Sequence, residues 1–428
     1  MIKLSQLKKD SLLYTFFNFF ERGIPFLILP LITRVIEIEQ VGYYILFQTI
    51  INILIPFLTL NIDSVTLINY YKLGKPEFKK YFSTAVNLFV IYFLFIFLII
   101  FLLSNIISNL ISFESDWLIF SAIIVFFQFF VNLHKSLMRV EKKVFSFGLY
   151  SVSLVLIRNI ISFILILKFN FGWTGILYGH FISYLIGSLI AFYDFYKKDF
   201  ISANLNKNHI IDIFKTGAPI SFHKLGLWLG SGYNKMIVVA IIGISAGAQY
   251  GIGATFAMLL TMLSTSINNA LVPHVYELLK KGFEDDKKKI VSITFKIYGI
   301  FLFFAIIFVL VGNNFTTFIF GDKYIDSQYL VFPLVLAAFF RCLYTLHVNY
   351  IFYTKKTYRV TQITIVSGVI NCFLAYFLIL YNGIFGAALS LLFINFIQYI
   401  LAFYFSNKLI NMPWINFFHK GLIKTNDK

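Results

Sequence analysis

Apolar segments of membrane-spanning length recur along the whole chain. A helix needs roughly 20 apolar residues to cross about 30 Å of hydrocarbon, and the sequence holds twelve segments of this kind. They are continuously apolar instead of alternating, which favours helices over the strands of a membrane barrel. The segments are 12–33, 43–62, 82–103, 117–137, 147–167, 173–193, 216–242, 248–272, 291–312, 328–350, 360–381 and 384–405. We therefore predict an all-α integral membrane protein with twelve transmembrane helices.

The basic residues indicate how these helices are oriented. Charged residues make up only 13% of the chain, against about 25% in soluble proteins. If the N-terminus is cytoplasmic, 28 of the 36 Lys and Arg residues fall in cytoplasmic segments, and the external loops hold only Arg34, Lys168 and Lys323. Cytoplasmic loops carry such an excess, so both termini are predicted inside. The net charge of +17 then reflects topology, and no nucleic-acid partner is expected.

Short motifs indicate that the two halves of the chain are similar. His134 and His347 each precede a Lys-Lys pair by eight residues, and Gly172 and Gly383 each open a Gly-x-x-Gly sequence at the sixth and twelfth segments. Each half has six spans, an even number, so both halves start on the same side of the membrane. They are therefore predicted to be parallel repeats, with the pathway between them. The predicted domains are an N-terminal six-helix lobe (1–200), a cytoplasmic linker (201–215), a C-terminal six-helix lobe (216–410) and a cytoplasmic tail (411–428).

The sequence shows none of the common catalytic motifs. It has no Walker A sequence, nucleophile elbow, H-E-x-x-H motif or dinucleotide fingerprint, each of which supplies a specific chemical group at a fixed spacing. Cys342 and Cys372 both fall in predicted spans without the spacing of a metal site. We expect a protein that binds and transports, not an enzyme, with no metal site and no cofactor.

Charged side chains inside the predicted spans are the candidate functional residues. A charge at the bilayer centre costs about 2.5–3.5 kcal/mol, so a span keeps one only for a partner, a ligand or a wet cavity. Glu21 is the one acid well inside a span, and Asp63 lies near an inner end. Arg22 could be neutralised by either acid, and Lys235 could extend to the interface. The basic residues are Arg22, Arg158, Lys224, Lys235 and Arg341. Their excess over acids favours a hydrated cavity that receives an anion.

Several motifs are shared with a known group of transporters. The first segment reads Ile24-Pro25 through Pro30-Leu31-Ile32-Thr33-Arg34 and leads to Gly42-Tyr43-Tyr44, and a later region pairs Gly251 with Pro273-x-x-Tyr276. With the six-plus-six plan, the chain resembles, from Leu12 to about Ser406, the polysaccharide transporters of the MOP (multidrug/oligosaccharidyl-lipid/polysaccharide) superfamily, in particular O-antigen flippases of the Wzx type. It departs from many of these relatives at Asn234-Lys235, where they have an Asp-Arg pair.

The resemblance implies a function and a setting. Such proteins have two lobes around an inward-opening central cavity and move undecaprenyl-diphosphate-linked oligosaccharide, an O-antigen or similar repeat unit, from the cytoplasmic to the periplasmic leaflet. The expected location is the bacterial inner membrane, and the expected partners are membrane lipids, a polysaccharide polymerase and a chain-length regulator. A diphosphate needs several Lys or Arg donors, so the five basic residues are the predicted substrate-binding residues. A proton or sodium gradient, coupled through Glu21 or Asp63, or the membrane potential would drive the movement.

The sequence is also compatible with other functions. A multidrug exporter of the same superfamily is the main alternative, but a site for organic cations should be lined with acids instead of bases. A twelve-span transporter of the major facilitator type, and a scramblase or scaffold, are further alternatives. A membrane glycosyltransferase or polymerase would need long external loops, and every predicted external loop is short.

Overall fold

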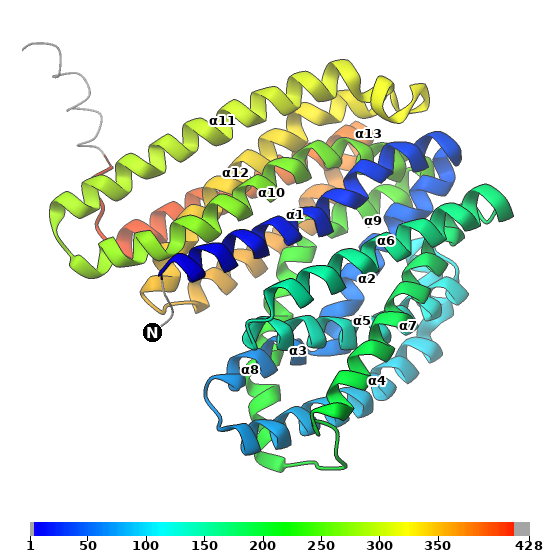
Figure 1. Ribbon diagram of the computed structural model, residues 1–428. Coiled ribbons are helices and arrows are strands. Elements are labelled where there is room, and N and C mark those ends of the chain that lie inside the picture. Colours follow the sequence, from blue (N-terminus) through cyan, green and yellow to red (C-terminus); the bar gives the residue numbers. More distant parts are fainter. Residues whose placement is uncertain (1–3, 415–428) are drawn as a thin grey trace, which may run out of the picture. The chain divides into compact units, whose positions relative to one another are not determined.

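The protein is helical in every part that the structure describes. The computed structural model (Figure 1) describes residues 4–414, and for residues 4–12, 15, 18, 19 and 22 it describes the backbone only. The elements are α1 (Leu4–Val35), α2 (Ile38–Thr59), α3 (Ile62–Tyr70), α4 (Lys75–Ile111), α5 (Ser115–Val140), α6 (Val144–Phe169), α7 (Trp173–Lys197), α8 (Lys207–Leu229), α9 (Gly232–Ile241), α10 (Ile244–Lys281), α11 (Glu284–Phe320), a 3₁₀ turn η1 (Asp322–Tyr324), α12 (Ser327–Tyr353) and α13 (Tyr358–Leu409). The predicted all-α class is confirmed.

The helices follow the predicted apolar segments. Among the described residues, nine helices are long and apolar enough to cross a membrane. The first segment lies in α1, and the seventh is divided between α8 and α9. The last two both lie in α13, whose backbone leaves the helical region at Gly383 with φ 58° and ψ −142°. This arrangement is consistent with twelve crossings.

Contacts divide the chain into two compact units. The first unit comprises the described residues up to Trp228 together with Lys235–Ala248, and the second comprises Leu229–Asn234 with the described residues from Gln249 onward. The predicted lobe boundaries at 200 and 216 rest on repeated sequence and stay a prediction. In the first unit, α4, α5 and α7 are joined by packed aromatic rings, such as Phe89 stacked on Phe129 at 3.5 Å between centroids.

One face of α8 docks on α2 and α3 within the first unit. Gly217 lies so close to the broken end of α2 that an added Cβ would overlap the carbonyl oxygen of Leu60. Three turns further along α8, the indole nitrogen of Trp228 donates to the carbonyl of Thr49 at 3.1 Å. At the other end, Asn69 of α3 donates to Asp212 at 3.0 Å. These contacts explain why α8 is grouped with the first unit.

The last described residues pack against α10 and α11 within the second unit. Met412 and Trp414 are buried, 5% and 8% exposed, in a cluster with Val275, Leu278 and Ile290 of α10 and α11. These two residues belong to the predicted tail 411–428. The remainder of that tail, 415–428, lies outside the described residues.

Candidate anion-binding site

Arg158 lies among neutral polar side chains inside the first unit. It projects from α6, is half-buried, and lies within electrostatic reach of Tyr44, His180 and Tyr184. Within the described residues, no carboxylate forms an ion pair with it. Glu21 also lies within electrostatic reach of Tyr184, but its carboxylate pairs with Lys135 and not with Arg158.

The proton on His180 can be assigned from its two neighbours. Its Nδ1 lies 2.9 Å from the carbonyl oxygen of Ile176, which can only accept, so Nδ1 carries the hydrogen. Its Nε2 then accepts from the amide of Gln48 at 3.3 Å. The ring is thus held as a neutral imidazole facing Arg158, and it adds no second charge to this part of the site.

Lys224 is bound to the break between α2 and α3. Its ammonium donates to the side-chain carbonyl of Asn61, and Asp63 is within electrostatic reach of both Lys224 and Arg139. The Lys224 residue is exposed, whereas Asn61 is fully buried. Among the predicted site residues, Lys224 and Asp63 are therefore neighbours.

Arg341 belongs to the second unit, where its neighbours are also neutral. Its Nη1 donates to Gln398 at 2.8 Å, and its guanidinium lies 4.7 Å from the ring centroid of Tyr344. Gln398 is itself fixed by donation to Ser367 at 2.6 Å. The charge of Arg341 is held by an amide and an aromatic face, both of which leave it available to an anion.

The structure gives less information on two of the predicted residues, Lys235 and Arg22. Lys235, in the part of α9 grouped with the first unit, is half-buried, and no ion pair or hydrogen bond to it is found in the described chain. The side chain of Arg22 lies outside what the structure describes. The convergence of all five basic residues on one chamber stays a prediction, because Arg341 and the other four belong to different units.

Glu21 forms an ion pair that the sequence analysis missed. Its carboxylate lies 2.5 Å from the ammonium of Lys135, and the two side chains are 25% and 16% exposed. Lys135 lies near the end of the predicted span 117–137 but was counted with the cytoplasmic segment. Lys135 follows His134 in an apolar run, and this position could have placed it among the charged residues inside the spans.

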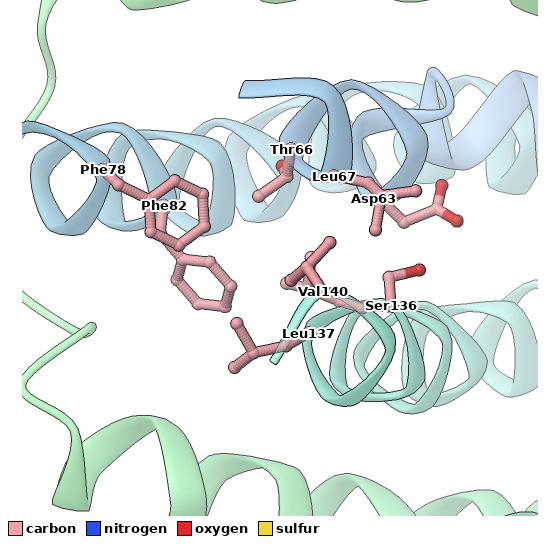
Figure 2. Close-up of a pocket in the computed structure, with 9 residues that line it drawn as sticks. Asp63, Thr66, Leu67, Phe78, Phe82, Ser136, Leu137 and Val140 are labelled. Atoms are coloured by element: carbon pink, nitrogen blue, oxygen red, sulfur yellow. The ribbon is translucent and has the colours of Figure 1, made fainter. Parts of the chain in front are cut away.

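A small cavity lies beside Asp63 in the first unit. It lies between α3, α4 and α5 and comprises about 180 Å³, including space open to solvent, and Figure 2 shows Asp63 and Ser136 facing each other across one side of it, with Phe78 and Phe82 at the other. Ser136 is also bonded by Arg139 at 2.9 Å. The cavity is too small and too apolar to receive a lipid-linked sugar, so the basic residues remain the candidate site.

The fold is that of a class of membrane transporters. The chain is similar over 92% of its length to an inward-facing multidrug resistance MATE family transporter of the MOP superfamily, with 94% of that chain covered, 16% identity and a TM-score of 0.68. It is equally similar to the lipid II flippase MurJ in an inward closed conformation, with 97% and 94% covered, 17% identity and a TM-score of 0.68. The structure is thus a multi-pass membrane protein with the MOP fold.

The sequence comparison identifies the family. The model of the polysaccharide biosynthesis protein family matches residues 7–279, which is more than half of the chain. A protein of the Lsg locus of Haemophilus influenzae is 22% identical over 374 residues, covering 85% of this chain and 88% of that protein. This chain belongs to the polysaccharide biosynthesis protein family, and it has the fold of the MOP superfamily transporters that the sequence analysis expected.

Proposed function

We propose that this protein carries an oligosaccharide linked to undecaprenyl diphosphate from the cytoplasmic to the periplasmic leaflet of a bacterial inner membrane. The observation that supports it most is the state of Arg158, an arginine inside a span that lies within electrostatic reach of tyrosine hydroxyls and a histidine and forms no ion pair with a described carboxylate. A charge kept in a membrane without an acid to cancel it is suited to an anionic ligand. Arg341 repeats the pattern with Gln398 and Tyr344.

The diphosphate is the part of the substrate that these groups would bind. Guanidinium groups form bidentate, charge-assisted hydrogen bonds with phosphate oxygens. The hydroxyl groups of neutral sugars carry no charge and cannot form such bonds. Arg22, Lys224 and Lys235 join Arg158 and Arg341 in this proposal as further donors. The substrate would be an O-antigen or similar repeat unit, and a polymerase and chain-length regulator would act on the product.

The membrane potential is the energy source that we propose. Glu21 is already paired with Lys135, so this acid is not free to bind a driving cation in this conformation, and the charges of Lys224 and Arg139 near Asp63 oppose a cation there. An inside-negative potential favours outward movement of a doubly charged head group by about 4.6 kcal/mol per 100 mV. Both termini would lie in the cytoplasm.

The same pairing argues against export of organic cations. Multidrug resistance transporters share the fold, but a cationic drug needs acids that are not already neutralised by the protein's own lysines. The two acids predicted to take part are in contact with, or near, basic groups. The charge balance of the site therefore favours an anion.

Transport in vesicles separates these functions. The purified protein would be placed in proteoliposomes with a fluorescent undecaprenyl-diphosphate disaccharide, and arrival at the far leaflet would be followed with a membrane-impermeant quencher. Protein-dependent movement that rises with an inside-negative potential is expected, and empty liposomes give the background. Efflux of ethidium by the same vesicles, without movement of the lipid-linked sugar, would contradict the proposal.

A further inference from the structure

The break between α2 and α3 is formed by two residues in the left-handed conformation. Leu60 and Asn61 have φ values of 47° and 51°, and neither is glycine. Asn adopts this conformation more readily than most residues. Asn61 is 0% exposed, and its backbone N–H donates to the hydroxyl of Thr59 at 3.2 Å. The break therefore holds one buried amide side chain in a fixed place.

The Asn61 amide joins the break to two residues of α8. Its Nδ2 donates to the hydroxyl of Ser221 at 2.7 Å, and its Oδ1 accepts from the ammonium of Lys224. The orientation of the amide is determined by its partners, because Lys224 can only donate and the Ser221 hydroxyl already donates to the carbonyl of Gly217 at 3.1 Å. The side chain thus has one orientation that satisfies all three groups.

The bond to Lys224 leaves the lysine charged. An amide carbonyl is a neutral acceptor, so it orients the ammonium without cancelling its charge, as a carboxylate would. Lys224 is also exposed, so its ammonium can be reached by a ligand. Asp63 of α3 lies within electrostatic reach of Lys224 and also of Arg139 of α5, so one negative and one further positive charge lie near the lysine.

We infer that Asn61 is a positioning residue whose neutral amide oxygen holds the Lys224 ammonium until a phosphate group of the substrate displaces it. This inference rests on the proposed function. The diphosphate adds the attraction between opposite charges, which the neutral amide oxygen does not supply, so a diphosphate can take the ammonium from the amide. It would compete poorly with a carboxylate in the same position.

The Asn61→Asp substitution tests this directly, because Asp has the same shape and also tolerates the left-handed backbone. Binding of undecaprenyl diphosphate would be measured in detergent, with undecaprenol as the neutral lipid control. We expect at least tenfold weaker diphosphate binding than in the parent, with undecaprenol binding unchanged. If Asn61 had only a structural role, the substitution would weaken the binding of both lipids to the same extent.

A second pair of variants isolates the lysine. In a Lys224→Gln background, Asn61→Asp should weaken diphosphate binding less than twofold further, because no ammonium remains to be captured. If Asn61→Asp does not fold, Asn61→Gly keeps the backbone conformation and removes the acceptor, and it should weaken binding at least threefold. Diphosphate affinity within twofold of the parent in the folded Asp or Gly variant would overturn the inference. A parent that binds undecaprenol as tightly as undecaprenyl diphosphate would instead contradict the proposed function.

Discussion

Gly172 and Gly383 adopt the same rare backbone conformation, with φ of 56° and 58° and ψ of −138° and −142°. Each begins a helix that the sequence analysis placed last in its half of the chain. Such values are accessible to glycine and strongly disfavoured for residues with a Cβ. Two independent turns with matching geometry support the proposal that the halves are repeats, whatever their boundaries.

Gly383→Ala is expected to destabilise the protein through backbone strain alone. Nothing lies within 4 Å of a Cβ added at this position, so no clash accompanies the substitution. The expected loss is about 1–3 kcal/mol, measured as a lower thermal midpoint in detergent. Gly74→Ala, which has equal space and a φ of −66°, should be near neutral. Equal midpoints for the two variants would show that the Gly383 turn is not strained for alanine.

The buried histidines of the two halves also correspond. His134 bonds to Asp194 at 3.2 Å and His347 to Ser406 at 3.3 Å, over sequence separations of 60 and 59 residues. Asp194 belongs to a chain of charges that continues through Lys198 to Glu141. Similar histidines therefore have an ionic environment in one half and a neutral one in the other.

Gly217→Ala should weaken the packing of α8 against the break between α2 and α3. The added Cβ would overlap the backbone carbonyl of Leu60, which cannot move aside as a flexible side chain could. We expect a loss of about 1–3 kcal/mol in unfolding experiments. Gly299→Ala in α11 is the matched control, because nothing lies within 4 Å of its added Cβ and alanine favours a helix by about 1 kcal/mol. A Gly217→Ala protein as stable as the control would contradict the close packing described.

Removing one partner of the Glu21 and Lys135 pair should leave the other charge poorly solvated. Glu21→Gln or Lys135→Gln is expected to cost about 1–3 kcal/mol, and the double variant less than the sum. Lys288→Gln, which breaks the exposed pair with Asp285, should leave the thermal midpoint nearly unchanged. Additive losses in a double-mutant cycle would mean that the two side chains do not interact.

Asn234→Asp should be unfavourable because of the hydrogen bonds that this side chain makes. The Asn234 amide nitrogen donates to the carbonyl of Ala387 at 2.9 Å and to Ser390 at 2.8 Å, while its oxygen accepts from Asn371 at 2.6 Å. A carboxylate cannot donate to Ala387, so a loss of about 1–3 kcal/mol is expected at pH 8.

That loss should shrink as the pH falls. Burial disfavours the ionised form, so the introduced acid takes up a proton in the folded state at a higher pH than in the unfolded chain, and the protonated form can donate. Asn314→Asp, at an exposed position bonded only to its own helix, should change little. A pH-independent loss in Asn234→Asp would contradict this account.

Hydropathy predicted the helices because span length and apolar composition are properties of single segments. It could not predict the break at Leu60 and Asn61, since neither residue is glycine or proline and the left-handed turn depends on packing against α8. The Glu21 and Lys135 pair joins residues 114 positions apart, which is likewise set by tertiary structure. Arg158 and Arg341 were identified from sequence because an uncompensated charge in a span is itself the signal.

The charge on Arg158 is the most direct test of the central claim. Initial rates of lipid-linked disaccharide movement would be compared in proteoliposomes for the parent, Arg158→Lys, Arg158→Gln and Arg341→Gln, with Lys168→Gln as an exposed basic control. The account predicts at least a tenfold loss for both glutamine variants, a smaller loss for lysine and none for the control. Parental rates in both Arg158→Gln and Arg341→Gln would contradict it.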